Sequence, residues 1–264
     1  MSDWGKGAKN NTIGYGQGAC DNTIGWGTSQ KDNNSWSGDT DISGCSGAAS
    51  LAQIDNLNSI AFDGVNDYID AGTGVGNALG SSATNFSVSG WFKTTINPLP
   101  SNEGMFAFGD HTSSTSNSPF HFYQGSFNVF DVFFGNTQYH RYTVDVYTGG
   151  IKWINYVISY DGTQSASADR LKLYIDGVFL APSIVGSTIP TSINLTNNIN
   201  TIGVSATNKF YNGSIDEIAV FNYSLTEAEA LSIYNATAVV DGVNKTADLI
   251  QLTTPPIAWY RMGD

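Results

Sequence analysis

The sequence predicts an all-β protein, an antiparallel β-sandwich with one short helix towards its C-terminal end. Short segments in which apolar and polar residues alternate recur between residues 60 and 221 and predict strands. Asparagine, serine, threonine and glycine are abundant, whereas charged residues make up 13% of the chain, against about 25% in an average domain. This composition is typical of short strands joined by polar turns.

The clearest strand pattern lies at residues 86–93, where apolar residues alternate with polar ones and predict a half-buried strand. Further strands are predicted at residues 105–108, 120–123, 127–134, 141–147, 153–160, 171–175, 178–180, 201–204 and 214–221. Asp176-Gly177 joins two of them and predicts a tight hairpin, because both central residues of such a turn need a positive φ.

The predicted helix begins at Thr226, whose hydroxyl can cap the first turn while Glu229 reaches back to the Thr226 amide. The helix is expected to end near Asn235. Its apolar side is expected to consist of Leu225, Ala228, Leu231 and Tyr234.

Three regions are expected along the chain: an arm at residues 1–50, the sandwich at residues 51–236 and a tail at residues 237–264. The arm contains an 11-residue repeat that starts at Trp4 and again at Tyr15, with a decayed third copy from residue 26. One unit offers too little apolar area for a core of its own.

Aromatic residues distinguish the arm and the tail from ordinary linkers, which are usually poor in them. We therefore expect these side chains to contact a partner protein, with a flexible glycine-rich leader as the alternative for the arm. The expected contact residues are Trp4, Tyr15, Trp26, Trp36, Trp259 and Tyr260.

The formal net charge of −12 disfavours contact with nucleic acid and with anionic lipid, since no lysine or arginine cluster offsets it. No run of 18 apolar residues predicts a membrane span, and the N-terminus has no apolar stretch of signal-peptide length, so no export by a standard signal is expected.

Cys20 and Cys45 do not have the spacing of a zinc site; they form one disulfide or stay as free thiols.

Four segments in order resemble the laminin-G-like family of the concanavalin A-like sandwiches. They are residues 60–69, residues 86–92, residues 153–162 together with 173–177, and residues 210–222. The resemblance implies a jelly-roll sandwich over most of residues 60–235. It implies less about function, because this fold hosts lectins, adhesion modules, virion proteins and glycosidases.

The flanking regions resemble predicted structural proteins of marine bacteriophages. The resemblance rests on the repeats from Trp4, the run at residues 35–42 and the ending at residues 259–264. It implies a homo-oligomeric virion protein, assembled in a host cytoplasm and anchored to other virion proteins through its arm.

Hydrolysis is not expected. A retaining glycosidase needs two carboxylates about 5–5.5 Å apart, and on this fold they usually come from one strand at alternate positions. Glu227 and Glu229 fall in the helix start, Glu103 is expected in a loop, and Asp216 and Glu217 are adjacent, so they should point to opposite faces.

One structural Ca²⁺ is the cofactor that the resemblance implies, held by a carboxylate and several backbone carbonyls where the first and last strands of the domain meet. The matching residues are Asp63 and Asp216, with Asp67 as a further candidate. The alternative is that Asp63-Gly64 forms a turn and that Asp216 pairs with a backbone amide.

A glycan site is expected to use aromatic faces, and residues 120–147 are the densest source of them. Tyr123, Tyr139 and Tyr142 are the candidate ligand residues, although alternate members of these strands must fill the core. Three hypotheses follow: a non-enzymatic virion protein that displays a glycan-binding sandwich, a secreted or cell-surface carbohydrate-binding adhesion module, and a glycosidase.

Overall fold

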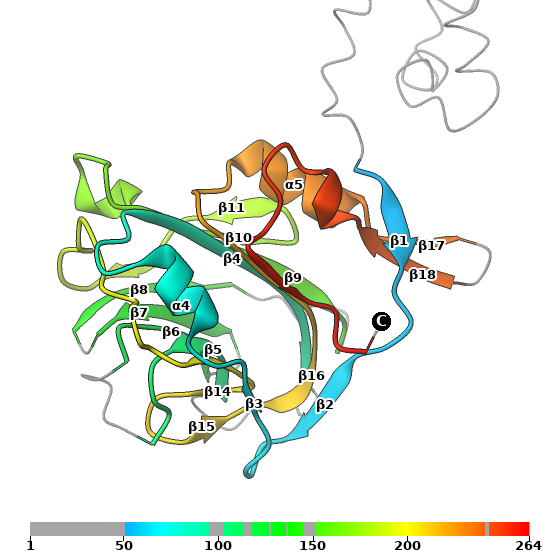
Figure 1. Ribbon diagram of the computed structural model, residues 1–264, viewed down its shortest axis with the longest axis horizontal. Coiled ribbons are helices and arrows are strands. Elements are labelled where there is room, and N and C mark those ends of the chain that lie inside the picture. Colours follow the sequence, from blue (N-terminus) through cyan, green and yellow to red (C-terminus); the bar gives the residue numbers. More distant parts are fainter. Residues whose placement is uncertain are drawn as a thin grey trace, which may run out of the picture. The chain divides into compact units, whose positions relative to one another are not determined.

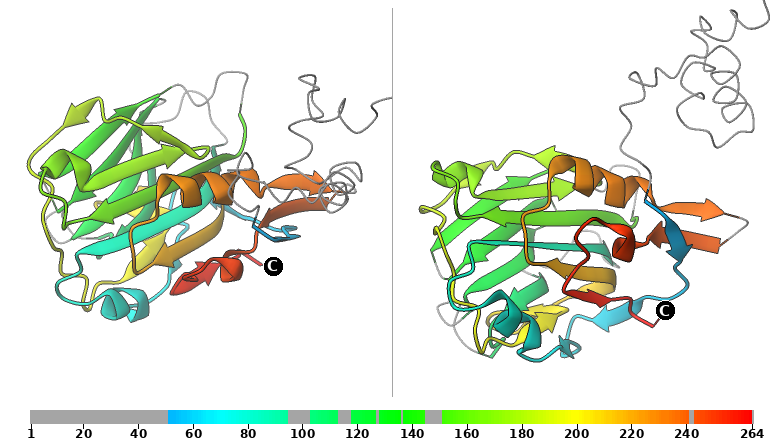
Figure 2. Two further views of the ribbon diagram at one scale, coloured as in Figure 1. Left: turned by 90° about the horizontal axis from the view of Figure 1, so that it is seen from above. Right: turned by 45° about the horizontal axis from the view of Figure 1, so that its top comes forward.

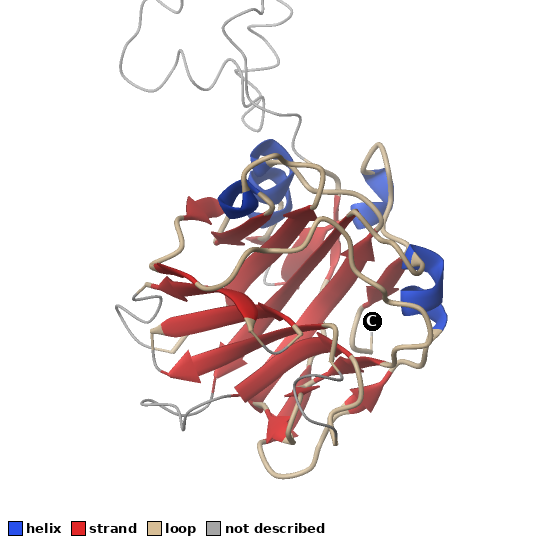
Figure 3. Ribbon diagram, turned by 90° about the vertical axis from the view of Figure 1, so that its left-hand side faces the viewer, coloured by secondary structure: helices blue, strands red, loops and turns tan. Residues whose placement is uncertain are grey.

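The chain forms a β-sandwich in which two large antiparallel sheets pack face to face (Figure 1, Figure 3). This computed structural model describes residues 51–94, 103–112, 118–126, 128–135, 137–144, 151–240 and 243–263. The predicted fold class is confirmed. The predictions for the arm, for Cys20 and for Cys45 lie outside the described residues.

Each large sheet contains seven strands. Sheet I has the order β11 (Val178–Leu180), β10 (Leu171–Ile175), β9 (Ile154–Asp161), β4 (Asn85–Thr94), β16 (Asn212–Phe221) and β19 (Ala258–Tyr260), with β2 (Ile60–Asp63) also paired to β16. Sheet II has the order β12 (Ile184–Val185), β8 (Gln138–Thr143), β7 (Val129–Phe134), β6 (Phe120–Ser126), β5 (Glu103–Phe108), β13 (Asn200–Ile202) and β3 (Ile69–Asp70).

Smaller elements complete the fold. They are a three-stranded sheet of β1 (Gln53–Asp55), β18 (Val243–Ala247) and β17 (Ala238–Val240), a two-stranded hairpin of β14 (Val204–Ser205) and β15 (Lys209–Phe210), helices α4 (Gly74–Leu79) and α5 (Glu227–Asn235), and the 3-10 turns η2 (Ser167–Asp169) and η3 (Leu249–Gln251). No helix in the described ranges is long and apolar enough to cross a membrane.

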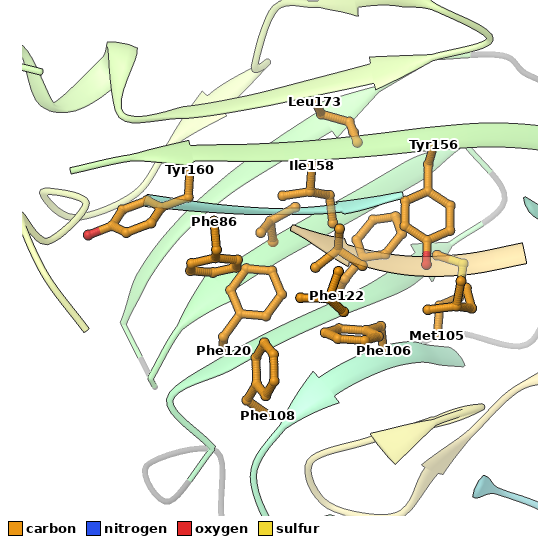
Figure 4. Close-up of a cluster of buried hydrophobic side chains, with 14 of the residues drawn as sticks. Phe86, Met105, Phe106, Phe108, Phe120, Phe122, Tyr156, Ile158, Tyr160 and Leu173 are labelled. Carbon is orange, nitrogen blue, oxygen red and sulfur yellow. The ribbon is translucent and has the colours of Figure 1, made fainter. Parts of the chain in front are cut away.

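The main core lies between the two sheets and is dominated by aromatic rings (Figure 4). Phe120 lies near its centre, with its ring 5.1 Å from that of Phe86 and 5.4 Å from that of Phe134, both in edge-to-face geometry. Such aromatic pairs contribute about 0.5–1.5 kcal/mol each beyond the area they bury. A rigid aromatic core of this kind fixes the outward-facing residues of the same strands.

A second apolar cluster covers the outer face of sheet I. There Val157, Tyr174, Ala219 and Phe221 of the sheet pack against Leu225, Ala230 and Ile233 in and before α5. As a result β4 is buried on both faces. The half-buried strand predicted from its alternation is therefore wrong, because its small outward residues Ser87 and Ser89 accommodate a covering layer.

The local turn and cap predictions are confirmed. Asp176 and Gly177 have φ values of 49° and 75° in the β10–β11 hairpin. Thr226 and Glu229 form the reciprocal capping box of α5.

The apolar side predicted for α5 is only partly correct: Leu225 is buried and Tyr234 stacks on Trp91, but Leu231 is 42% exposed. The buried residues of the helix itself are Ala230 and Ile233. A spacing of three residues drifts by about 60° per step in a helix of 3.6 residues per turn, so the four predicted positions do not share one face.

The C-terminal segment belongs to the sandwich and is not a separate tail. β19 pairs antiparallel with β16 and extends the edge of sheet I (Figure 2). Met262 belongs to the main core. Trp259 and Tyr260, which were expected to contact a partner protein, here contact their own chain. The Trp259 indole packs against the second apolar cluster, and Tyr260 packs against the first.

Candidate functional site

Two rows of side chains cross the outer face of sheet II at β6, β7 and β8. The strand register places His121 opposite Phe133 and Phe133 opposite Tyr139, which makes an aromatic row. Two residues further along, a polar row of Tyr123, Asp131 and Arg141 crosses the same strands. Both rows lie on the face opposite the core because side chains alternate along each strand.

The rings of the aromatic row stack on one another almost in parallel. The centroid distance is 5.0 Å from His121 to Phe133 and 4.7 Å from Phe133 to Tyr139, with interplanar angles of 7° and 13°. Tyr123 joins the stack diagonally, 5.5 Å from Phe133 at 16°. We call these four rings the aromatic stack. Phe133, Tyr139 and Tyr123 stay partly exposed, whereas His121 is buried.

Asp131 and Arg141 form a bidentate ion pair beside the aromatic stack. The guanidinium donates from Nε to Oδ1 at 2.7 Å and from Nη2 to Oδ2 at 2.8 Å. Asp131 is fully buried, whereas the Arg141 side chain is 37% exposed. The hydrogen bond to Asp131 raises the pKa of Arg141. One edge of the guanidinium is thus held in place while the rest faces solvent.

Neighbouring residues keep this pair in position. Gly125 leaves room for the carboxylate, since a Cβ there would lie 3.0 Å from the Asp131 Oδ2 atom. The Arg141 Cζ atom lies 6.0 Å from the centroid of the Tyr139 ring, at the limit of a cation–π contact. The ion pair therefore connects the polar row to the aromatic stack.

Burial keeps two titratable groups of this face neutral near pH 7. It lowers the pKa of His121 to about 4, and the nearby Ser118 backbone offsets this only in part. It also raises the pKa of Tyr123, and the negative charge of Asp131 adds to the effect. The Tyr123 phenol stays a hydroxyl and the His121 imidazole stays uncharged, so Arg141 supplies the positive charge of the two rows.

This arrangement is suited to recognition of a polar ligand with apolar ring faces. The stacked rings turn their faces towards one another, so their edges, the tyrosine hydroxyls and the guanidinium remain for a ligand. Sites of this kind combine an apolar surface with a few polar groups held in fixed positions. A pyranose ring offers C–H groups and hydroxyls that match both kinds of contact.

The structure separates the three tyrosines that the sequence suggested for this role. Tyr123 and Tyr139 lie on the same outer face, and Phe133, which the sequence analysis missed, connects them. Tyr142 is fully buried in the main core, 3.3 Å from His140 Nδ1 through its hydroxyl, and offers no surface to a ligand. Tyr139 and Tyr142 are three residues apart on one strand, so they point to opposite faces.

The three aspartates expected to hold Ca²⁺ do not lie in one place. Asp63 accepts hydrogen bonds from the Val65 and Asn66 amides, and Asp67 Oδ2 accepts one from the Asp63 amide, as in a turn. Asp63 pairs with Asn212, four residues and therefore about 13 Å along β16 from Asp216.

Asp216 instead accepts a hydrogen bond from the Glu217 amide. Among the described residues, no group of three or more histidine, cysteine, aspartate or glutamate side chains is arranged to hold a metal ion. The three aspartates therefore do not form one cluster of carboxylates, and we assign no role to a metal here.

Two of the acidic residues considered for hydrolysis, Glu103 and Glu217, accept hydrogen bonds from groups of the fold itself. Glu217 lies at a bulge of β16 and accepts hydrogen bonds from Trp259 Nε1 at 2.6 Å and from Arg261 Nε at 3.3 Å. Glu103 was predicted to lie in a loop, but it is the first residue of β5 and is 3% exposed. The Glu103 carboxylate accepts a hydrogen bond from the Asn212 amide of β16 at 3.2 Å.

Replacement of Glu103 by glutamine is expected to stabilise the protein above pH 7 by about 1–2 kcal/mol and to have no effect below pH 4.5. Burial raises the pKa of Glu103 to about 7. The folded protein therefore binds this proton more tightly than the unfolded chain, and the contribution of Glu103 to stability decreases as the pH rises from about 4.5 to 7.

Urea unfolding of both proteins at pH 4.5, 6 and 8 tests this prediction. His121 acts in the opposite direction, since its lowered pKa removes stability as the pH falls from about 6.5 towards 4. The difference between Glu103→Gln and wild type cancels that contribution. A gain that is equal at all three pH values would contradict the prediction.

A shallow pocket of about 250 Å³ lies on the other sheet, where β9 and β10 meet the start of α5. Two of its polar groups have partners within the fold: Ser159 Oγ donates to the Leu225 carbonyl, and Asp161 accepts from Thr163 and Gln164. The Ser159 bond, together with the bond from Ser224 Oγ to the Tyr160 carbonyl, attaches the loop before α5 to sheet I.

The chain is similar to several solved structures. The Ruminococcus gnavus IT-sialidase CBM40 bound to α2,3-sialyllactose matches with a TM-score of 0.50 and 15% identity, over 70% of this chain and 100% of that one. A Limulus polyphemus SAP-like pentraxin matches with a TM-score of 0.48 and 10% identity, over 71% and 83%. The NanB sialidase of Streptococcus pneumoniae matches with a TM-score of 0.49 and 19% identity, over 71% of this chain and 30% of the NanB chain.

Comparison with curated protein sequences gives no match. The profile described as the concanavalin A-like lectin/glucanases superfamily, of the laminin-G type, matches residues 63–230, which is more than half of the chain. Apart from β2, which only its last residue Asp63 brings into this range, and β19, the strands of the two large sheets lie within the matched residues. The chain therefore belongs to the concanavalin A-like lectin/glucanases superfamily.

Proposed function

We propose that the sandwich is a non-catalytic glycan-binding module whose binding site is the outer face of sheet II. The observation that carries this proposal is the pairing of the aromatic stack with the fixed Asp131–Arg141 ion pair. The rings supply apolar contact, and the guanidinium and the hydroxyls of Tyr123 and Tyr139 supply hydrogen bonds to sugar hydroxyl or carboxylate groups. A domain with the same fold, the CBM40 of R. gnavus, is bound to sialyllactose.

Replacement of Tyr139 by alanine is expected to weaken glycan binding at least tenfold, since it removes about 1.4 kcal/mol or more of aromatic contact. A glycan array with the full chain identifies the ligand, and titration calorimetry with that glycan measures the affinity. Tyr139→Phe keeps the stack and removes only the hydroxyl, so its loss should be smaller.

Phe179→Ala is the matched control, because Phe179 is an aromatic residue of sheet I that is 42% exposed. It should leave the affinity unchanged. Wild-type protein that binds no glycan on the array, or Tyr139→Ala protein with wild-type affinity, would refute the proposed site.

The finer part of the proposal is that the chain is a structural protein of a bacteriophage virion, a capsid decoration or a tail or head fibre component. Its support is the repeated sequence from Trp4 and Tyr15 and the resemblance of both flanking regions to phage structural proteins. In this proposal residues 1–50 anchor a homo-oligomer to other virion proteins, and the sandwich faces host glycans. Immunogold labelling with an antibody against the sandwich should mark purified virions, whereas label confined to cell envelopes would favour an adhesion module.

A further inference from the structure

Three aromatic rings from distant parts of the chain meet at one end of the sandwich. Tyr68 precedes β3, His111 follows β5 and Phe210 lies in β15; β3, β14 and β15 lie together in Figure 1. The ring centroids are 4.4 Å apart from Tyr68 to His111, 6.3 Å from Tyr68 to Phe210 and 6.0 Å from His111 to Phe210. We call these three rings the loop platform. Tyr68 is 41% exposed, and the other two rings are partly exposed.

The turn between β14 and β15 is attached firmly to this platform. The Asn208 amide donates to the His111 carbonyl at 2.9 Å, and Asn208 Oδ1 lies 2.9 Å from His111 Nδ1. Thr207 and Asn208 have φ values of 64° and 56°. A β-branched residue such as Thr207 rarely adopts this conformation, so the contacts to His111 hold the turn in a conformation that its sequence does not favour.

The β2–β3 loop, which ends at Tyr68, carries polar groups. Asp67 precedes Tyr68 and accepts a hydrogen bond from the Asp63 amide, and Asn212 Nδ2 donates to the Asp63 carbonyl at 3.2 Å. The carboxylate of Asp67 therefore neighbours Tyr68 in the chain, and the loop is attached to β16 through Asn212. The loops that carry these groups are connected by hydrogen bonds, so the platform exists before any ligand arrives.

The geometry points to a second saccharide site on this platform, for uncharged sugar rings. The exposed face of Tyr68 can pack against the C–H face of a pyranose, while Asp67 and the neighbouring asparagines contact its hydroxyls. An anionic sugar is disfavoured, because the local side chains Asp63 and Asp67 are acidic and the whole chain carries a formal charge of −12.

A cage for an organic cation does not fit the same rings. Such a cage holds the cation between ring faces, but centroid distances of 4.4–6.3 Å show that these rings already touch one another. The rings are also tilted by 46–59°, so they form one continuous surface and not the parallel walls of a slot.

The loop platform shares no residue with the aromatic stack of sheet II. The two sites also differ in charge, since Arg141 is present at one and aspartates at the other. The second site therefore stands or falls independently of the first, and one set of variants separates them.

The experiment is saturation-transfer NMR and titration calorimetry on the full chain, with the methyl glycosides of glucose, galactose, mannose and N-acetylglucosamine, lactose, and 3′-sialyllactose as probes. We expect at least one uncharged probe to bind wild type and to lose at least tenfold in affinity with Tyr68→Ala. Phe179→Ala, which removes a ring of nearly equal exposure, should leave this affinity unchanged, and Tyr139→Ala reports on the sheet II site. His111→Ala serves as a second variant, with thermal melting as the check on folding.

Wild-type affinity of Tyr68→Ala for every uncharged probe would overturn the inference, as would a wild type that binds none of them. If Tyr139→Ala alone abolishes all binding, the loop platform is not a sugar site and the proposed function stands. If Tyr68→Ala alone abolishes it, the sheet II site fails and the loop platform stands.

Discussion

Replacement of Arg141 by methionine is expected to lower the free energy of unfolding by about 3–5 kcal/mol, because it leaves the buried Asp131 carboxylate without its cation. Asp131 is fully buried, and both of its oxygens accept hydrogen bonds from Arg141. Methionine retains much of the apolar stem, so the change removes mainly the charge and the hydrogen bonds. The variant should also bind glycans more weakly, since the guanidinium belongs to the proposed site.

Urea unfolding of a double-mutant cycle isolates this interaction. Asp131→Asn combined with Arg141→Met removes both charges, so the double variant should be more stable than Arg141→Met alone. If Arg141→Met costs less than about 1 kcal/mol, the pair behaves like an exposed surface salt bridge and does not hold the site together.

Replacement of Glu217 by alanine is expected to destabilise the protein by about 2–4 kcal/mol and to detach the C-terminal strand. Glu217 is 3% exposed and connects β16 to β19 through Trp259 and Arg261. The Arg261 Cζ atom lies 5.3 Å from the centroid of the Trp259 ring, so these residues form one cluster. Without the carboxylate, the partly buried Trp259 indole N–H loses its acceptor.

Hydrogen exchange of the β19 amides, together with urea unfolding, measures both effects. Glu227→Ala is the matched control, because Glu227 is an exposed residue in the first turn of α5 and should cost only about 0.5 kcal/mol. Protection of β19 that is unchanged in Glu217→Ala would show that backbone pairing with β16 is sufficient to hold the strand.

Glu217 also shows how local rules fail at a bulge. Adjacent residues of a regular strand point to opposite faces, which is what the sequence suggested for Asp216 and Glu217. The register of β16 shifts between Asp216 and Ala219, and Glu217 adopts a φ of 53°. Both side chains are consequently buried, at 4% and 3% exposure. A bulge depends on the partner strands, so the sequence of β16 alone does not reveal it.

The candidate site was predicted in part. The density of aromatic residues in 120–147 pointed to the strands that carry the candidate site, and Tyr123 and Tyr139 lie on its outer face. Phe133 and the Asp131–Arg141 pair were missed, because they depend on the register of β6, β7 and β8. The alternation of side chains along a strand also distinguishes Tyr139 from Tyr142. Their positions differ by three, an odd number, so the two side chains point to opposite faces.

By itself, the sequence determined the fold class, the Asp176-Gly177 hairpin and the capping box of Thr226 and Glu229. These features depend on residues close together in the chain, whose backbone preferences act locally. Only the tertiary structure decided that Trp259 completes sheet I, that Arg141 reaches Asp131, and that Tyr68, His111 and Phe210 form one surface. Those contacts join residues up to about 140 positions apart, and their geometry depends on how two sheets pack, which no local preference specifies.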